Sequence, residues 1–300
     1  MASCTGCTPD GSRAKAALLG GENQWALQDK KIAQVLAKIR YKILVTSGKG
    51  GVGKSSVTVN LAVALAASGY QVGILDCDIH GPSIPTLLNL QNEITADANG
   101  LIPAKARDNL VVVSMDALMA DKDTPILWRG TKKGQAIREF LSDVQWGNLD
   151  YLIIDSPPGT GDEPMTVLEA IPDALCVVVT TPQEVSLNDV RKTVNFLAQV
   201  HANNLGLVEN MSGLTCPYCH KEIDLFKKGG GEKLAQEQGL TFLGAIPLDP
   251  ASVVAADQGL PIVELDIDSP AKTAFKTLAQ NIITASANSL EILAHMGKRS

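Results

Sequence analysis

One run of the chain, residues 43–56, constrains the fold more than any other feature. It has the pattern of a buried strand, a glycine-rich loop and the start of a helix. Its centre fits the phosphate-loop pattern G-x-x-x-x-G-K-[ST], written here as Gly48-Lys49-Gly50-Gly51-Val52-Gly53-Lys54-Ser55. Glycines let successive backbone N–H groups turn inward around a triphosphate, where a Cβ would collide with it. The helix that follows points its positive end at the same anion, so the run predicts a nucleotide-binding loop.

The polar side chains of this loop have separate expected roles. Lys54 is placed to reach the β- and γ-phosphates, and the hydroxyl of Ser55 is placed to ligate Mg²⁺, which prefers hard oxygen ligands. The residues expected around the nucleotide extend to Ser56. Lys49 lies at a position that the ordinary pattern leaves unconstrained, so the pattern alone indicates a solvated lysine there.

Length and patterning predict one large α/β unit. Three hundred residues with 45% hydrophobic content can bury a large core. Strand-like and helix-like runs alternate, which indicates a doubly wound, mostly parallel sheet flanked by helices. We expect a single phosphate-loop domain over residues 25–300, in which residues 25–40 form an amphipathic helix that leads into the first strand. Residues 1–24 are small and polar without an apolar period, and are expected to form a flexible arm.

Charge and hydropathy argue against several classes of partner. A net charge of −6 disfavours an extensive nucleic-acid surface. No stretch approaches the roughly 20 apolar residues of a membrane span, and the N-terminus lacks a secretion signal. We therefore expect a cytoplasmic protein that binds neither nucleic acid nor membrane.

Acidic residues follow two of the expected strands. Asp76 and Asp78 come after one strand, and Asp155 ends another. In open α/β sheets the ligand lies beyond the carboxyl ends of the strands, where these carboxylates can serve magnesium or an attacking water. Alternation places Cys77 on the other side, as a buried thiol. The alternative for Asp76 and Asp78 is a structural role in a turn, which aspartate favours. The loop after Asp155, residues 156–162, is placed to sense the γ-phosphate.

The six cysteines include two C-x-x-C pairs, Cys4–Cys7 and Cys216–Cys219. In a reducing compartment such residues are expected to be ligands or buried thiols. Two thiolates satisfy neither zinc nor an iron-sulfur cluster, so the first pair is either part of a metal site or an exposed dithiol. The second pair has three interpretations. The first is a redox dithiol, which normally follows the first strand of a small fold. The second is a zinc knuckle, which needs a second C-x-x-C pair nearby. In the third, two chains supply four thiolates to a 4Fe-4S cluster across a two-fold axis.

Two further segments are candidate binding elements. Asn210 ends an expected strand over residues 205–211 and either hydrogen-bonds an adenine edge or is a turn asparagine. Residues 128–130 form either a substrate or interface loop or a purely structural one. His220, beside the second cysteine pair, is either a solvated side chain or an auxiliary ligand.

Together these motifs resemble a known family. The phosphate loop, with Lys49 as the signature lysine, resembles the deviant Walker A motif of the MinD, ParA and nitrogenase iron-protein superfamily. Five further motifs resemble the Mrp/ApbC family of iron-sulfur cluster carrier ATPases: Trp128-Arg129-Gly130, Asp155-Ser156-Pro157-Pro158-Gly159-Thr160-Gly161-Asp162, Asn210-Met211-Ser212, Cys216-Pro217-Tyr218-Cys219 and Ile246-Pro247-Leu248-Asp249-Pro250. The resemblance covers about residues 25–265.

The resemblance implies an ATP-hydrolysing scaffold or carrier that works as a homodimer. Cys216 and Cys219 of both chains would share one labile 4Fe-4S cluster for transfer to apo iron-sulfur proteins. Lys49 would reach the phosphates across the dimer interface and act in catalysis with Lys54. Asp78 would orient the hydrolytic water, and the ligands of Mg²⁺ would be Ser55 with Asp76 and Asp155, directly or through water.

The chain departs from the family pattern at several positions. His220 replaces a usual glycine, Thr131-Lys132-Lys133 replaces a commoner Pro-Met pair, and an arginine usual near Val253 is missing. A related subgroup has four N-terminal cysteines for a second cluster. Here the arm has only Cys4 and Cys7, so a second cluster at this pair is left open.

Two other functions occur in the same superfamily. A positioning ATPase like MinD or ParA, without a cluster, is the main alternative, and it needs a basic amphipathic tail or patch. Residues 290–300 contain only Lys298 and Arg299 as strong cations, too few to favour it. A reductase component like the nitrogenase iron protein has single, widely spaced cluster cysteines, unlike the adjacent pair here.

Overall fold

The structure is a computed structural model that describes residues 25–78, 81, 83–91, 93–118, 130–216, 219 and 221–296. Several expectations concern residues outside these ranges: Cys4, Cys7, Trp128, Arg129 and His220.

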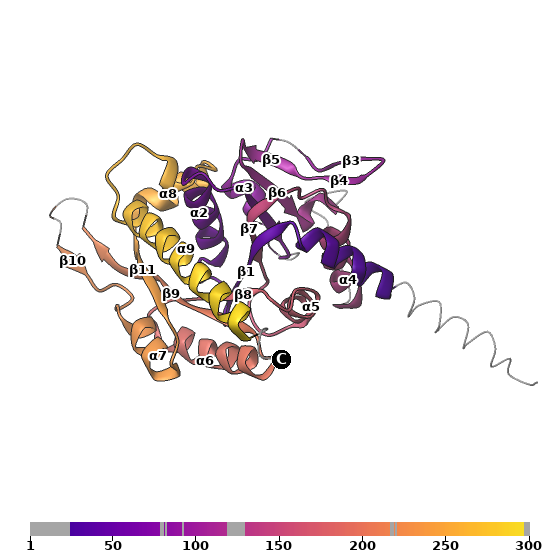
Figure 1. The fold of residues 1–300 in the computed structure, drawn as a ribbon. Helices are drawn as coiled ribbons and strands as arrows, with labels where there is room; N and C mark the ends of the chain where they lie inside the picture. The colour runs from indigo at the N-terminus through magenta and orange to yellow at the C-terminus, as the bar shows by residue number, and fades with distance from the viewer. Residues whose placement is uncertain are drawn as a thin grey trace, which may run out of the picture.

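A mostly parallel sheet forms the centre of the molecule (Figure 1). Over the described residues it has nine strands in the order β10-β9-β8-β1-β7-β2-β6-β5, with β11 paired to β9. The strands are β1 (Ile39–Ser47), β2 (Val72–Asp76), β5 (Ala104–Arg107), β6 (Leu110–Ser114), β7 (Leu149–Asp155), β8 (Leu175–Thr180), β9 (Asn203–Thr215), β10 (Glu222–Ile223) and β11 (Phe242–Leu248). Antiparallel pairing joins β5 to β6 and β10 to β9. Central parallel strands need burial on both faces, which explains their continuous apolar runs.

Helices cover both faces of the sheet (Figure 1). They are a helix over residues 25–36, α2 (Lys54–Ala67), α3 (Ile84–Leu87), α4 (Gly130–Asp143), α5 (Asp162–Ala170), α6 (Glu184–Gln199), α7 (Gly230–Gln238), α8 (Pro250–Asp257) and α9 (Pro270–Met296). Two 3₁₀ turns, η1 (Met115–Leu118) and η2 (Ile262–Glu264), and a separate hairpin of β3 (Thr95–Asp97) and β4 (Gly100–Ile102) complete the described elements. Among these helices, none is both long enough and apolar enough to cross a membrane.

Two hydrophobic cores lie on opposite faces of the sheet. Ile43 and Val45 of β1 pack with α2 and α9, whereas Leu44 packs on the other face with α4, α5, α6, α7 and the first helix. The predicted doubly wound architecture is therefore confirmed. The carboxyl ends of the parallel strands are brought to one edge, where open α/β sheets bind their ligands.

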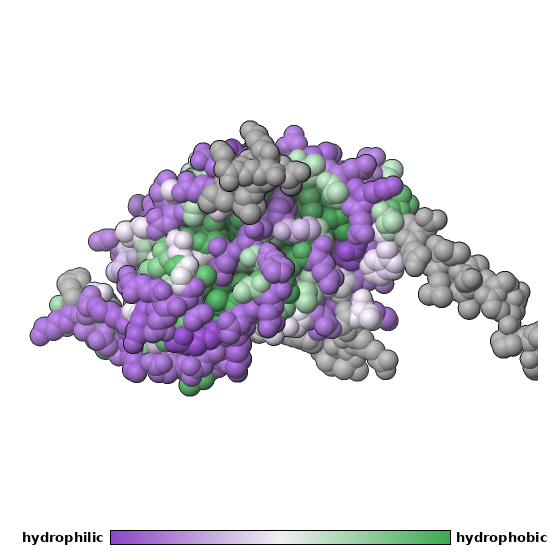
Figure 2. Space-filling model, turned by 60° about the horizontal axis from the view of Figure 1, so that its bottom comes forward, coloured by the Kyte–Doolittle hydropathy of each residue, from purple (hydrophilic) through white to green (hydrophobic). Residues whose placement is uncertain are grey.

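The structure differs from the expected elements mainly at their ends. The helix expected over residues 25–40 stops at residue 36, and Ile39 begins β1. Strand β9 continues past its apolar stretch to Thr215, because β10 and β11 pair with its polar end. The surface turned forward in Figure 2 is largely hydrophilic, with hydrophobic side chains gathered near its middle.

Candidate functional site

The glycine-rich loop joins β1 to α2 at this edge of the sheet. Gly51 and Gly53 have φ angles of 81° and 79°, in the left-handed region that favours glycine. A Cβ on Gly53 would lie 2.3 Å from the side-chain nitrogen of Asn210, and one on Gly48 would lie 2.5 Å from the backbone of Asp189. Gly53 precedes α2 without a side-chain cap, so the first N–H groups of the helix remain available to an anion.

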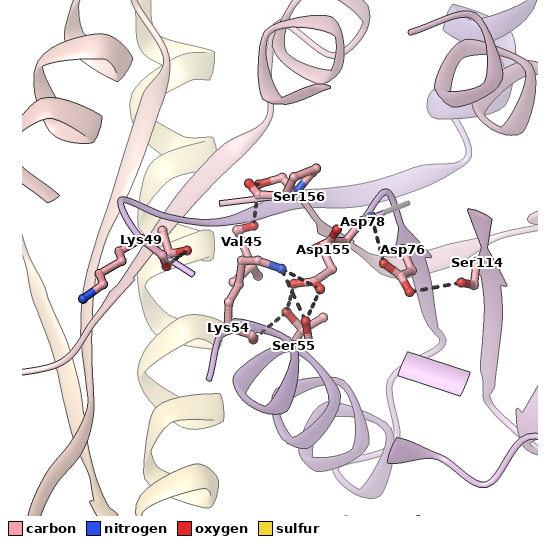
Figure 3. Close-up of polar contacts among 12 residues, drawn as sticks. Val45, Lys49, Lys54, Ser55, Asp76, Asp78, Ser114, Asp155 and Ser156 are labelled. Carbon is pink, nitrogen blue, oxygen red and sulfur yellow. Dashed lines mark hydrogen bonds and ion pairs between the residues drawn. The ribbon is translucent and has the colours of Figure 1, made fainter. Parts of the chain in front are cut away.

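Three side chains of α2 converge on Asp155 at the end of β7 (Figure 3). The Lys54 ammonium nitrogen lies 2.7 Å from one carboxylate oxygen, and Ser55 donates a hydrogen bond of 2.6 Å to the same atom. Thr58 donates to the other oxygen at 2.7 Å. Lys54 and Asp155 are both buried, so their charges interact with little screening by water. This arrangement brings a cation, a hydroxyl and a carboxylate together under the loop.

A second buried carboxylate, Asp76, lies at the end of the neighbouring strand β2. Its two oxygens accept hydrogen bonds of 3.0 Å from the backbone N–H of Asp78 and from the hydroxyl of Ser114 (Figure 3). Burial, and secondly the negative charge of Asp155, raise the pKa of Asp76 to about 8. A divalent cation would favour the ionised form of both Asp76 and Asp155. Their carboxylate oxygens and the hydroxyl oxygen of Ser55 are hard ligands of the kind that Mg²⁺ prefers.

Replacing Asp76 with asparagine should change how stability depends on pH. The folded protein holds a proton on Asp76 up to about pH 8, whereas the unfolded chain releases it near about pH 4. This contribution to stability is therefore complete below about pH 4 and is lost as pH rises through about 8. Asparagine does not ionise, so the free energy of unfolding of Asp76→Asn relative to wild type should rise by about 1 kcal/mol per pH unit between about pH 5 and 8. Denaturant unfolding of both proteins, with EDTA and without nucleotide, measures this difference in the free energy of unfolding at each pH. A difference that stays constant across this range would contradict the expectation.

Lys49 is exposed and lies apart from this cluster. Its side chain points away from Lys54 and Asp155 in Figure 3, and its carbonyl oxygen accepts a hydrogen bond of 3.0 Å from Ser47. Within one chain, therefore, Lys49 does not join the group formed by Lys54, Ser55 and Asp155. Asp78 follows the last residue of β2 by two positions and is partly buried, and its backbone N–H donates to the Asp76 carboxylate.

Asn210 connects β9 to the loop and borders a cavity. Its side-chain N–H donates a hydrogen bond of 2.9 Å to the carbonyl oxygen of Val52. With Gly53 and Ser56 it lines a cavity of about 200 Å³, whose other side is formed mainly by residues of the β11–α8 segment. The lining is mainly apolar, with the Asp249 carboxylate among its few polar groups, a combination suited to a flat, partly polar ring such as a nucleobase.

Cys216 and Cys219 lie in sequence between β9 and β10, and β10 is the strand at one edge of the sheet (Figure 1). Cys216 is partly buried and its N–H donates to the carbonyl oxygen of Lys221 at 2.9 Å, while Cys219 is exposed. In contrast, Cys77 and Cys176 are completely buried, and burial raises the pKa of both thiols, to about 12 for Cys176. In the described part of the chain, no group of three or more metal-ligating side chains forms. The described hairpin therefore offers one pair of accessible thiols.

Comparison with known families decides the affiliation of this chain. The family model described as ParA, NUBPL iron-transfer P-loop NTPase, matches residues 38–283. The chain belongs to this family. The resemblance inferred from the motifs is thus confirmed, and the family is one of P-loop NTPases.

Relatives of this iron-transfer NTPase agree with that assignment. The iron-sulfur cluster carrier protein of Methanocaldococcus jannaschii is 50% identical over 260 residues, which cover 86% of this chain and 89% of that protein. The cytosolic Fe-S cluster assembly factor NUBP2 of Bos taurus is 44% identical over 255 residues, 83% of this chain and 94% of that one.

Solved structures of similar fold include two nucleotide-binding proteins. A nucleotide-binding protein from Archaeoglobus fulgidus in complex with ADP has a TM-score of 0.70 and 40% identity, over 79% of this chain and 94% of that one. The cell division ATPase MinD of Pyrococcus furiosus has a TM-score of 0.62 and 25% identity, over 81% and 98%. The iron-transfer NTPase therefore has the fold of the MinD and ParA proteins.

The sequence patterns missed three buried polar features of this NTPase. Thr58 follows Lys54 by four residues, so helical spacing places both on one face of α2. Lys133 of α4 and Glu163 of α5 form a buried ion pair of 2.8 Å, whose partners are too far apart in sequence for a local pattern to link. Glu209 is a charged residue in an otherwise apolar part of β9, and that contrast is a signal that could have identified it.

Proposed function

We propose that this protein binds and hydrolyses ATP as a carrier that holds a 4Fe-4S cluster at Cys216 and Cys219 and transfers it to apo iron-sulfur proteins. The observation that carries the proposal is that one strand, β9, is hydrogen-bonded to the phosphate loop through Asn210 and leads directly into the accessible thiol pair. Membership of the iron-transfer family, and relatives named as cluster carriers, support the same function.

In this proposal the loop residues Gly48 to Ser56 surround the phosphates, and Lys54 holds the β- and γ-phosphates. Ser55 and Asp155, with Asp76 directly or through water, are the proposed ligands of Mg²⁺, which supplies charge neutralisation at the phosphates. Asp78 orients the attacking water. Asn210 and the cavity beside it hold the base, a role supported by the apolar lining and the size of that cavity.

We further propose a homodimer with a bridging cluster. A 4Fe-4S cluster takes four thiolates, and the described hairpin supplies two, so a two-fold axis through the cluster completes the set. Ile223 and Leu225, which follow the cysteine pair, are large apolar side chains exposed by 43% and 54%, as expected of a surface that meets another protein. Lys49, exposed and turned away from Lys54, then reaches the nucleotide of the partner chain.

ATP binding and hydrolysis are coupled to transfer in this scheme because closure of the dimer around nucleotide changes the exposure of the cluster. The proposed ATPase domain spans residues 25–300, and the arm over residues 1–24, with Cys4 and Cys7, is accessory to it. The proposed location is the cytoplasm, as in the cytosolic assembly factor NUBP2.

Anaerobic reconstitution of the purified full chain tests the function. We expect about four iron and four sulfide per dimer, by chemical assay and light scattering. We also expect faster delivery of the cluster to an apo-ferredoxin when Mg·ATP is present. A protein that takes up no iron but sediments with liposomes or DNA in the presence of ATP would instead be a positioning ATPase.

A further inference from the structure

Strand β9 contains a buried carboxylate, that of Glu209, to which the function above assigns no role. The residue is 0% exposed. One oxygen accepts hydrogen bonds from the N–H of Gly229 at 2.8 Å and from the hydroxyl of Ser212 at 2.6 Å. The other oxygen accepts from the N–H of Gly231. A buried charge is costly unless it is hydrogen-bonded in this way, so the contacts indicate a specific structural task.

The partners of Glu209 lie on both sides of the cysteine hairpin. Ser212 lies in β9, shortly before Cys216 in the sequence. Gly229 and Gly231 come after β10, at the start of α7. The carboxylate therefore closes the base of the segment 212–231, which contains both cysteines. The negative charge also lies at the positive end of α7, which stabilises that contact. A Cβ on Gly231 would lie 3.0 Å from the nearest carboxylate oxygen, so the approach depends on glycine.

The residue after Glu209 is bonded to the phosphate loop. Asn210 donates its hydrogen bond of 2.9 Å to the carbonyl oxygen of Val52. The residue that contacts the hairpin segment, Glu209, and the residue that contacts the phosphate loop, Asn210, are thus consecutive in one strand. A second link lies beside the first. Met211 and Phe226, which belong to β9 and to the clamped segment, line a cavity of about 160 Å³ together with residues 49–52 of the loop. A shift of the phosphate loop therefore also displaces the base of the cysteine hairpin, because these short, packed contacts join the two.

We propose that Glu209 is a positioning residue that couples nucleotide binding at the phosphate loop to cluster binding at Cys216 and Cys219. The inference rests on the proposed function, and it adds a specific connection between the two sites. Because such coupling is reciprocal, a cluster on the hairpin changes the affinity of the loop for nucleotide by the same factor as nucleotide changes the affinity for the cluster.

The test compares nucleotide affinity in the cluster-loaded and cluster-free full-length protein, using Mg·ADP under anaerobic conditions. For wild type we expect the two dissociation constants to differ by about fivefold or more. Glu209→Gln keeps the shape of the side chain, but its NH₂ group faces an N–H donor, so at least one contact is lost. In this variant the ratio should fall to within about twofold of one, while the cluster-free affinity stays within about threefold of wild type.

Three further variants separate positioning from general damage. Ser212→Ala removes a single contact and should give an intermediate ratio, and it carries the test if Glu209→Gln does not fold. Glu209→Asp keeps the charge and should restore part of the coupling. Glu264→Gln, which breaks an ion pair of 2.7 Å with Arg107, is the matched control and should keep the wild-type ratio.

Hydrogen–deuterium exchange gives a second readout that needs no cluster. In cluster-free wild type, Mg·ADP should slow exchange both in the loop, residues 48–56, and in the clamped segment 212–231. In Glu209→Gln the loop should still respond, whereas exchange at residues 229–231 should be about tenfold faster and insensitive to nucleotide.

The outcomes of these experiments are distinguishable. Wild-type protein that takes up no iron would overturn the proposed function itself. Wild-type protein that loads a cluster but binds nucleotide equally well with and without it would overturn only the coupling. A wild-type ratio in both Glu209→Gln and Ser212→Ala would show that the carboxylate has no positioning role.

Discussion

Replacing Lys54 with alanine is expected to lower kcat for ATP hydrolysis by a factor of about 10³ or more. Its ammonium group is buried under the phosphate loop, 2.7 Å from Asp155, and thus points into the group of side chains at the end of β7. A cation held in a buried site neutralises charge that develops on the transferred phosphoryl group far better than a solvated one. Steady-state phosphate release with saturating Mg·ATP measures the loss.

The same substitution should also destabilise the folded protein without nucleotide. It removes the cation from beside the buried carboxylate of Asp155, and an uncompensated buried charge typically costs about 3 kcal/mol. Lys42 offers a matched control, because it is another buried lysine, located in β1 and paired with Asp173 at 2.6 Å. Lys42→Ala should lose stability but keep kcat. If Lys54→Ala kept kcat within about tenfold of wild type, Lys54 would not be the phosphate-binding lysine.

The parts of the fold that the sequence predicted follow from local rules. Central parallel strands such as β1, β7 and β8 are buried on both faces, and continuous apolar runs are the direct result. The phosphate loop combines glycines with positive φ, a lysine and a hydroxyl at fixed spacing, so its place between a strand and a helix could be predicted from a dozen residues. The positions of Asp76 and Asp155 followed from one rule about strand ends.

The features that could not be predicted depend on partners distant in the sequence. Asn210 was expected either to hydrogen-bond the adenine of the nucleotide or to lie in a turn. Its hydrogen bond to Val52 joins residues 158 positions apart. Glu209 and Gly231 are 22 positions apart, across a hairpin whose second strand has only two residues. Short exposed strands such as β10 carry no hydrophobic period, because their pairing satisfies backbone groups without burying an apolar face. A periodicity argument is insensitive to such elements.

Replacing both Cys216 and Cys219 with serine should abolish cluster binding and leave nucleotide binding as it is in cluster-free wild type. Iron is held in such clusters by thiolates, and a serine hydroxyl is both harder and far less acidic than a thiol. Bound iron should therefore fall from about two atoms per chain to background after anaerobic reconstitution. Mg·ADP affinity should stay within about twofold of that of cluster-free wild type, because Asn210 and the loop keep their contact.

The chain offers a control with the same number of thiols removed, Cys4→Ser with Cys7→Ser. If the hairpin holds the transferable cluster, this variant should keep at least the iron of the Cys216–Cys219 site and should still deliver it to an acceptor. The buried thiols do not complicate the comparison, because Cys77 and Cys176 are inaccessible in the folded protein. The opposite pattern, with iron lost only from the arm variant, would place the cluster on the arm. The bond from Asn210 to the loop would then support a nucleotide switch whose output is something other than metal transfer.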